Sequence, residues 1–161
     1  DLLNAREVQK GSFSRQIAFN VIPQIDAFMD NDYTKEEMKM VWETRKILGD
    51  DTILVNPTAV RVPVFYGHGE AIHIETRSPI DAQEVKALLA AAPGVKLYDD
   101  REEFPTQVCS ASGNDLTHVG RVRNDISHPN GINMWVVSDN IRKGAATNSV
   151  QIAETLIKDF L

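Results

Sequence analysis

Two capping boxes define where helices begin in this chain. In such a box, a Thr or Asp side chain accepts a hydrogen bond from the backbone three residues on, and a Glu at that position reaches back. Thr34 with Glu37, and Asp81 with Glu84, fit this pattern. Apolar residues at helical spacing follow each box, at Met38, Val41, Trp42, Leu48, Val85, Leu88 and Leu89. We therefore predict one helix after Thr34 and another after Asp81.

Short β-type segments occupy much of the remaining sequence. Residues 71–76 alternate between apolar and polar side chains, and residues 95–98 form a short segment after a Pro-Gly pair. Residues 117–123 and 132–138 flank a turn signal at 129–131, which predicts an antiparallel hairpin. A sheet that contains such a hairpin is not purely parallel.

Three further segments complete the expected fold. Apolar spacing predicts a helix over 20–29 with Pro23 in its first turn, and a final helix over 140–160. Residues 53–67 are β-type but interrupted by proline and glycine, so they predict two short extended segments. With about five strands and four helices in total, we expect an α/β fold of the α+β type. Its mixed, largely antiparallel sheet would carry helices packed on one face.

Composition excludes several classes of protein. The 161 residues, 42% of them hydrophobic, suit one globular domain or at most two very small ones. A net charge of -6 disfavours general binding to nucleic acid or to an anionic membrane. Apolar runs fall short of the roughly 20 residues of a membrane helix, and one cysteine excludes a disulfide framework. Because the chain opens at Asp1 without a signal-peptide pattern, we expect a piece of a longer protein.

Charged residues in two segments are candidates for ligand binding. Arg61 lies among valines, where a guanidinium needs either a structural carboxylate or an acidic ligand as partner. Glu36 and Lys39 are three residues apart on the first predicted helix and share a face. They form either a solvated surface pair or a patch that meets a zwitterionic or anionic ligand. The residues alone leave both questions open.

His68 lies between two glycines, Gly67 and Gly69. Glycines permit an unusual backbone and the close approach of another molecule. An imidazole also has a pKa suited to proton transfer near neutral pH. The segment is therefore either a turn with a histidine of no special role or a proton-transfer site.

Other reactive side chains do not predict a site. His68, Glu70 and His73 do not have the spacing of a helical zinc motif, and we predict no metal. Cys109 lies in a polar segment without basic neighbours, which indicates an inert thiol. Neither familiar glycine-rich phosphate loop is present, so a nucleotide-binding fold is not expected within the chain.

Nearly the whole chain resembles the aspartate-semialdehyde dehydrogenases, most weakly in residues 1–15 and 96–116. The resemblance is to their C-terminal substrate-binding and dimerisation half. It rests on the segments QIAFNVIPQIDAF, TKEEMKMVWETRKIL, VNPTAVRVPVFYGHGEAIHIET, VGRVRND and NMWVVSDNIRKGAATNSVQIAE.

The resemblance implies a fold like the C-terminal domain of glyceraldehyde-3-phosphate dehydrogenase over residues 1–161. It implies an enzyme that reduces aspartyl phosphate to aspartate semialdehyde with NADPH and releases phosphate. This reaction serves lysine, methionine, threonine and diaminopimelate biosynthesis. The nucleophilic cysteine and the NADP-binding domain precede the matched region, and Cys109 does not align with that cysteine. The resemblance also implies a homodimer and a cytoplasmic location.

Five residues fall on the family's functional positions. The resemblance implies that Arg61 binds the substrate carboxylate, Glu36 its amino group and Lys39 its phosphate. It also implies that His68 is the acid/base residue and that Asn140 meets the cofactor near its nicotinamide. Two alternatives remain: a non-catalytic dimerisation or anion-binding module, and a fragment of a related acyl-phosphate reductase. The Glu36/Lys39 pair and the RVPVFYGH run favour the aspartyl substrate over the second alternative.

Overall fold

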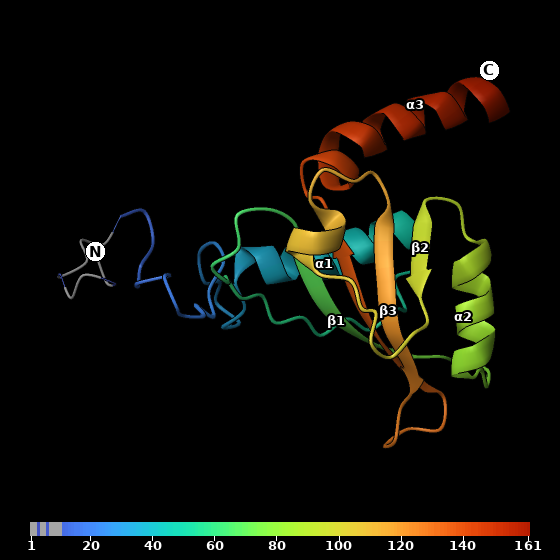
Figure 1. The fold of residues 1–161 in the computed structure, drawn as a ribbon, viewed down its shortest axis with the longest axis horizontal. Helices are drawn as coiled ribbons and strands as arrows, with labels where there is room; N and C mark the ends of the chain where they lie inside the picture. Colours follow the sequence, from blue (N-terminus) through green and yellow to red (C-terminus); the bar gives the residue numbers. More distant parts are fainter. Residues whose placement is uncertain (1–2, 4–5, 7–10) are drawn as a thin grey trace. The chain divides into compact units, whose positions relative to one another are not determined.

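The computed structural model describes Leu3, Arg6 and residues 11–161. The chain divides into two compact units, with the boundary between Pro63 and Val64. The first unit contains helix α1 (Lys35–Leu48). The elements of the second unit, labelled in part in Figure 1, are β1 (His68–Glu75), α2 (Ala82–Ala91), β2 (Val95–Tyr98), η2 (Gln107–Ala111), β3 (Thr117–Asn124), β4 (Gly131–Ser138), η3 (Arg142–Ala146) and α3 (Thr147–Asp159).

Helix α1 begins at the predicted capping box. The Glu37 N–H donates to Thr34 Oγ1 at 3.3 Å, and Glu37 Oε2 accepts from the Thr34 N–H at 2.8 Å. Gly49 ends the helix in the left-handed conformation that favours glycine, with φ of 65°. Glu37 is also buried and its Oε1 accepts from the Ala59 N–H at 2.8 Å. This second bond ties the start of α1 to the segment that carries Arg61.

The two backbone bonds of Glu37 predict a pH-dependent stability. The N–H groups of Thr34 and Ala59 hold the pKa of this carboxyl below its ordinary 4.5. Glu37→Gln replaces one acceptor oxygen by a donor, so we expect a loss of about 1.5–3 kcal/mol of unfolding free energy at neutral pH. A carboxyl with a lowered folded-state pKa stabilises the fold above its unfolded pKa. The difference between wild type and variant should therefore shrink as pH falls below 4.5.

Urea denaturation across this pH range measures the effect. Glu43→Gln is the matched control, because Glu43 is an exposed carboxylate on the same helix. It should change stability by less than about 0.5 kcal/mol. Equal losses in the two variants, or a Glu37→Gln loss that is independent of pH, would contradict this account of Glu37.

The predicted helix over 20–29 is wrong. Ile22 instead forms an antiparallel bridge with Arg61, and Phe28 forms one with Thr34. Phe19 and Asp26 have positive φ values of 57° and 69°, which a right-handed helix does not accommodate. The apolar residues of this segment therefore have helix-like spacing although the segment is irregular and held by two isolated β-bridges.

The β-type run over 53–67 forms no named strand, although two short extended segments were expected. Its one bridge is the pair between Arg61 and Ile22. Pro57 and Pro63 flank that bridge, and proline lacks the N–H that a longer ladder requires. This run accounts for the sheet having four strands where about five were expected.

The sheet of the second unit confirms the predicted fold class. Its strand order is β1-β4-β3-β2, with β1/β4 and β3/β4 antiparallel and β2/β3 parallel. Strands β3 and β4 form the predicted hairpin around residues 125–130. Helix α2, capped by Asp81 and Glu84 as predicted, lies alongside β2 (Figure 1). The core between α2 and the sheet contains Ala82, Val119, Val122 and Ile132.

The loop over 99–116 covers part of the sheet near its centre. Trp135 Nε1 donates to the Pro105 carbonyl oxygen at 3.0 Å, and a side chain at Gly120 would collide with the Pro105 ring. The polar segment around Cys109 contains the π-helical turn η2. This turn brings the Gln107 side chain against Gly69 at the start of β1.

The final helix confirms the prediction in outline only. It opens with the π-helical turn η3 and continues as α3, which buries none of its residues. In Figure 1, α3 extends away from the sheet beyond η3, so of the two α-helices in the second unit it is α2 that packs on the sheet. No helix in the described part of the chain combines the length and apolar character needed to cross a bilayer.

Candidate functional site

His68 begins strand β1 between two glycines that have structural reasons to be glycine. Gly67 has φ of 79°, and a Cβ there would lie 3.0 Å from the Ser138 carbonyl oxygen. A Cβ on Gly69 would collide with the side-chain amide of Gln107. The predicted unusual backbone is confirmed at Gly67, whereas the close neighbours of the two glycines are Ser138 and Gln107 of the same chain, so the approach of another molecule stays a prediction. The His68 side chain is exposed, as proton exchange with a ligand requires.

Asn140 lies next to this glycine-rich segment although it is 73 residues from Gly67. Its Oδ1 accepts a hydrogen bond from the Gly67 N–H at 3.0 Å. The structure thus brings the predicted cofactor-binding residue beside the backbone that carries His68. With Oδ1 engaged, the Nδ2 group of Asn140 is the part of the amide suited to donate to a ligand.

Arg61 is held in the first unit by its backbone. Its N–H donates to the Ile22 carbonyl at 2.8 Å, and its carbonyl accepts from the Ile22 N–H at 3.0 Å. The guanidinium carbon lies 5.7 Å from the centre of the Phe13 ring, in cation–π range. The described residues supply no ion-pair partner for it. Of the two partners considered for Arg61, a structural carboxylate is therefore not found among residues 11–161.

The surface beside Arg61 is hollowed. An open depression of about 340 Å³ is lined by Ser12, Phe13, Ser14, Ile22, Gln24, Asp26 and Arg61. Aromatic and hydroxyl side chains border the guanidinium there, and an exposed guanidinium can grip a carboxylate through two parallel hydrogen bonds. The same lining also includes the carboxylate of Asp26, so the depression combines a positive and a negative side chain.

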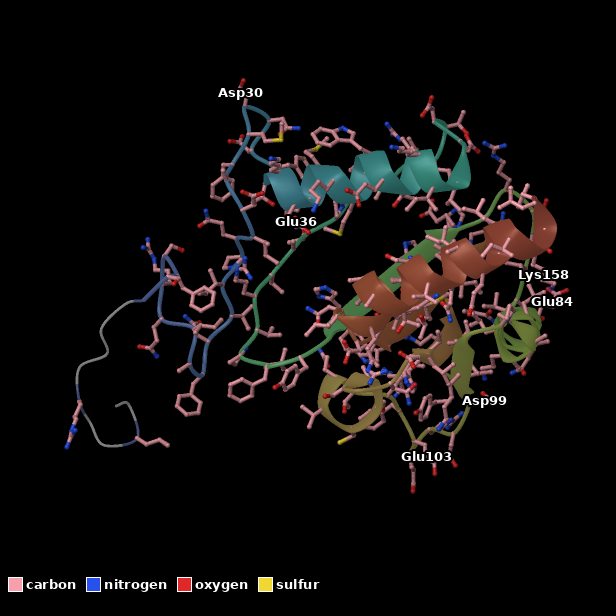
Figure 2. The ribbon with its side chains drawn as sticks, turned by 90° about the horizontal axis from the view of Figure 1, so that it is seen from above. Asp30, Glu36, Glu84, Asp99, Glu103 and Lys158 are labelled. Atoms are coloured by element: carbon pink, nitrogen blue, oxygen red, sulfur yellow. The ribbon has the colours of Figure 1, made fainter. Side chains whose placement is uncertain are left out.

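Glu36 and Lys39 form an ion pair on the first two turns of α1, where Figure 2 labels Glu36. Lys39 Nζ lies 3.1 Å from Glu36 Oε2, and the two side chains are 43% and 38% exposed. The hydrogen bond and the charge of Glu36 raise the pKa of Lys39 above its ordinary value. On binding a charged ligand, Lys39 would pair with a negative group of the ligand and Glu36 with a positive one, in place of their pairing with each other. The geometry is consistent with both interpretations offered for this pair.

Other reactive side chains have ordinary surroundings. Among the described residues, no three or more His, Cys, Asp or Glu side chains are placed to hold a metal ion. His73 instead contacts Asp125, with Nε2 and Oδ2 2.6 Å apart. Cys109 is an exposed free thiol in η2.

Three residues contact the backbone next to candidate site residues, and the sequence did not single them out for such contacts. Gln107 packs against Gly69, Glu37 bonds to Ala59, and the buried carboxylate of Asp139 precedes Asn140. Of the three, only Asp139 could have been recognised from the sequence, because Asp is a preferred residue just before a helical turn. The contacts of the other two join segments that are distant in the sequence.

Comparison with known proteins identifies the family. Residues 1–143 match the family model described as semialdehyde dehydrogenase, dimerisation domain. The chain belongs to this family. The dimerisation domain so defined includes the whole sheet and both glycines beside His68, and it ends before α3.

Relatives of this dimerisation domain are aspartate-semialdehyde dehydrogenases. The chain is 65% identical to the enzyme of Shewanella sp. (strain DB6705), over 99% of the chain and 47% of that protein. It is 52% identical to the enzyme of Aquifex aeolicus (strain VF5), over 92% of the chain and 44% of that protein. The chain thus spans about half the length of the curated relatives it matches.

Solved structures agree with the assignment of the dimerisation domain. Aspartate semialdehyde dehydrogenase II from Vibrio cholerae, complexed with ASA, has a TM-score of 0.94 and 64% identity, over 99% of this chain and 47% of that one. The Candida albicans enzyme, solved with NADP, has a TM-score of 0.72 and 27% identity, over 91% of this chain and 47% of that one.

Proposed function

We propose that the chain is the C-terminal part of an aspartate-semialdehyde dehydrogenase. In this proposal it supplies substrate binding, the acid/base histidine and the subunit interface of a homodimer. The observation that carries the proposal is the 64% identity, over 99% of the chain, to an enzyme solved with ASA. The complete enzyme would interconvert aspartyl phosphate and aspartate semialdehyde, with NADPH as reductant and phosphate as product, in the cytoplasm.

The charges of the proposed substrate match the charged residues of the first unit. Arg61 would bind the carboxylate, and its support is a guanidinium without an ion-pair partner among the described residues, beside an open depression. Glu36 would bind the ammonium group and Lys39 the phosphate. In the absence of a ligand the two side chains pair with each other. A substrate with both charges would replace that pair by two new ones.

His68 would exchange a proton with the reacting groups at one of its ring nitrogens. An exposed imidazole can both accept and return a proton near neutral pH. The close packing of Gly67 and Gly69 against Ser138 and Gln107 restricts the backbone on either side of His68. Such restriction supports proton transfer, which requires a fixed geometry.

NADPH would supply the hydride for the reduction. The exposed side chain of Asn140 fits the nicotinamide end of this cofactor, because its Nδ2 is available as a donor while Oδ1 accepts from Gly67. We assign most other contacts to the cofactor to the part of the protein outside this chain.

The isolated chain tests whether the groups needed for turnover are divided between this chain and the other half of the protein. We expect the purified 161-residue chain to show no NADPH-dependent turnover, because we place the nucleophilic cysteine and the dinucleotide-binding fold in the other half. The full-length protein should consume NADPH when aspartyl phosphate is supplied. Loss of NADPH absorbance measures both. Turnover by the isolated chain would contradict the proposed division.

The alternative of a non-catalytic module gives a different result. A full-length protein that binds phosphate in calorimetric titration but does not turn over with any acyl phosphate would support that alternative. Turnover with an acetylglutamyl phosphate in place of the aspartyl compound would identify a related acyl-phosphate reductase.

A further inference from the structure

Asp139 is a buried carboxylate directly after strand β4. Only 6% of the residue is exposed, and both of its oxygens accept backbone hydrogen bonds. Oδ2 accepts from the Gly113 N–H at 2.8 Å. Oδ1 accepts from the N–H groups of Ile141 at 2.8 Å and Arg142 at 3.0 Å. Asp139 therefore joins the loop after η2 to the first turn of η3.

These bonds keep Asp139 ionised. The N–H groups of Gly113 and Arg142 are the main cause of a pKa below the ordinary value for this carboxyl, against the opposing effect of burial. Hydrogen bonds to an ionised acceptor are stronger and shorter than neutral ones. A buried carboxylate with three such donors fixes the backbone on both sides of Asn140.

The connection continues from Asn140 to the histidine. Asn140 Oδ1 accepts from the Gly67 N–H at 3.0 Å, and Gly67 precedes His68. Ser138 is the register partner of His68 across the β1/β4 pair, and its carbonyl oxygen also lies close to Gly67. Residues 138–140 thus contact the His68 segment through a strand pair and one side-chain bond. A displacement of the Asn140 side chain would therefore also displace the Gly67 N–H that it accepts from, and with it the backbone of His68.

We propose that Asp139 is a positioning residue for the reaction. It holds the Asn140 amide in place and, through the bond between Asn140 and Gly67, orients the imidazole of His68. This inference rests on the proposed function of His68 and Asn140. A purely structural Asp139 would cap η3 and leave the geometry of His68 unchanged.

Substitution in the full-length protein tests the proposal. In Asp139→Asn, one oxygen can still accept from Ile141 and Arg142, but the amide nitrogen then faces the Gly113 N–H, so this link is lost. We expect kcat to fall about 10- to 100-fold, as for a small misplacement of a catalytic group. The KM for aspartate semialdehyde should change less than about threefold, because the residues proposed to bind it lie elsewhere.

Asp115→Asn is the matched control. Asp115 is an exposed carboxylate of the same region that accepts from Arg142 and Thr147, without a bond to Asn140. This variant should keep kcat within about twofold of wild type. Both variants are assayed well below their melting temperatures, so that a loss of stability does not appear as a loss of activity.

Two readouts separate positioning from plain stabilisation. In the background of His68→Gln, Asp139→Asn should lower kcat by less than about twofold, because residues that act as a unit are not additive. The amide proton resonance of Gly67 in the full-length protein should shift in Asp139→Asn and stay in place in Asp115→Asn. Full additivity with His68→Gln, or an unmoved Gly67 resonance, overturns the inference.

The same experiments distinguish this inference from the proposed function. If His68→Gln alone keeps wild-type activity, the proposed function of His68 fails, whatever the Gly67 resonance does. If His68→Gln is impaired but Asp139→Asn behaves like Asp115→Asn, the proposed function stands and the positioning role of Asp139 is wrong.

Discussion

His68→Gln in the full-length protein is expected to lower kcat by about 10²- to 10⁴-fold, the usual contribution of a general acid/base residue. Glutamine has a similar reach and hydrogen-bonding capacity but does not titrate, so it removes proton transfer and little else. The KM for aspartate semialdehyde should therefore remain close to that of the wild type. Steady-state kinetics at several pH values measure both constants, and the pH dependence assigned to the imidazole should disappear.

His73→Gln is the control for this substitution. His73 lies on the same strand, but five residues along, so it projects from the opposite face of the sheet and contacts Asp125. We expect kcat within about twofold of wild type for a change remote from the reacting groups. A His68→Gln enzyme as active as His73→Gln would show that the segment between Gly67 and Gly69 is only a turn.

Arg61→Ala is expected to raise the KM for aspartate semialdehyde about 10- to 100-fold, through loss of a hydrogen-bonded charge pair with the substrate carboxylate. The backbone bonds between residue 61 and Ile22 do not depend on the side chain, so the local fold should persist. Arg61→Lys should restore only part of the affinity, because an ammonium cannot form two parallel bonds to a carboxylate. Kinetics over a wide substrate range, with melting temperatures, measure these effects.

Arg123→Ala provides the comparison for Arg61. Arg123 is exposed, and its side chain donates to the Arg121 carbonyl oxygen in β3. Its removal should leave the KM within about twofold of wild type. An unchanged KM in Arg61→Ala together with a lower melting temperature would assign the guanidinium to the contact with Phe13 instead of to the substrate.

The elements that were predicted correctly are those with a local sequence signal. The boxes at Thr34 and Asp81 involve residues three apart, and both helices begin there. The hairpin signal at residues 129–131 likewise depends on a few consecutive residues, and β3 and β4 meet around it. These elements are determined by hydrogen bonds and turn conformations available within one short segment.

The prediction over residues 20–29 was wrong because distant segments compete for the same backbone groups. The spacing of apolar residues over 20–29 matched a helix, but pairing of Ile22 with Arg61 occupies backbone groups that a helix would use. Positive φ at Asp26 then interrupts any helical run. Periodicity counts apolar residues and contains no information about a partner some 40 residues away.

By itself, the sequence determined the two capped helices, the hairpin, the mixed sheet and the candidate residues Glu36, Lys39, Arg61 and His68. Only the tertiary structure showed that Asn140 bonds to Gly67 beside His68, that Glu37 bonds to Ala59, and that Asp139 bonds to Gly113. The physical reason is the range of the interactions. Caps and turns are satisfied within a few residues, whereas each of these three bonds requires the chain to have folded before donor and acceptor meet.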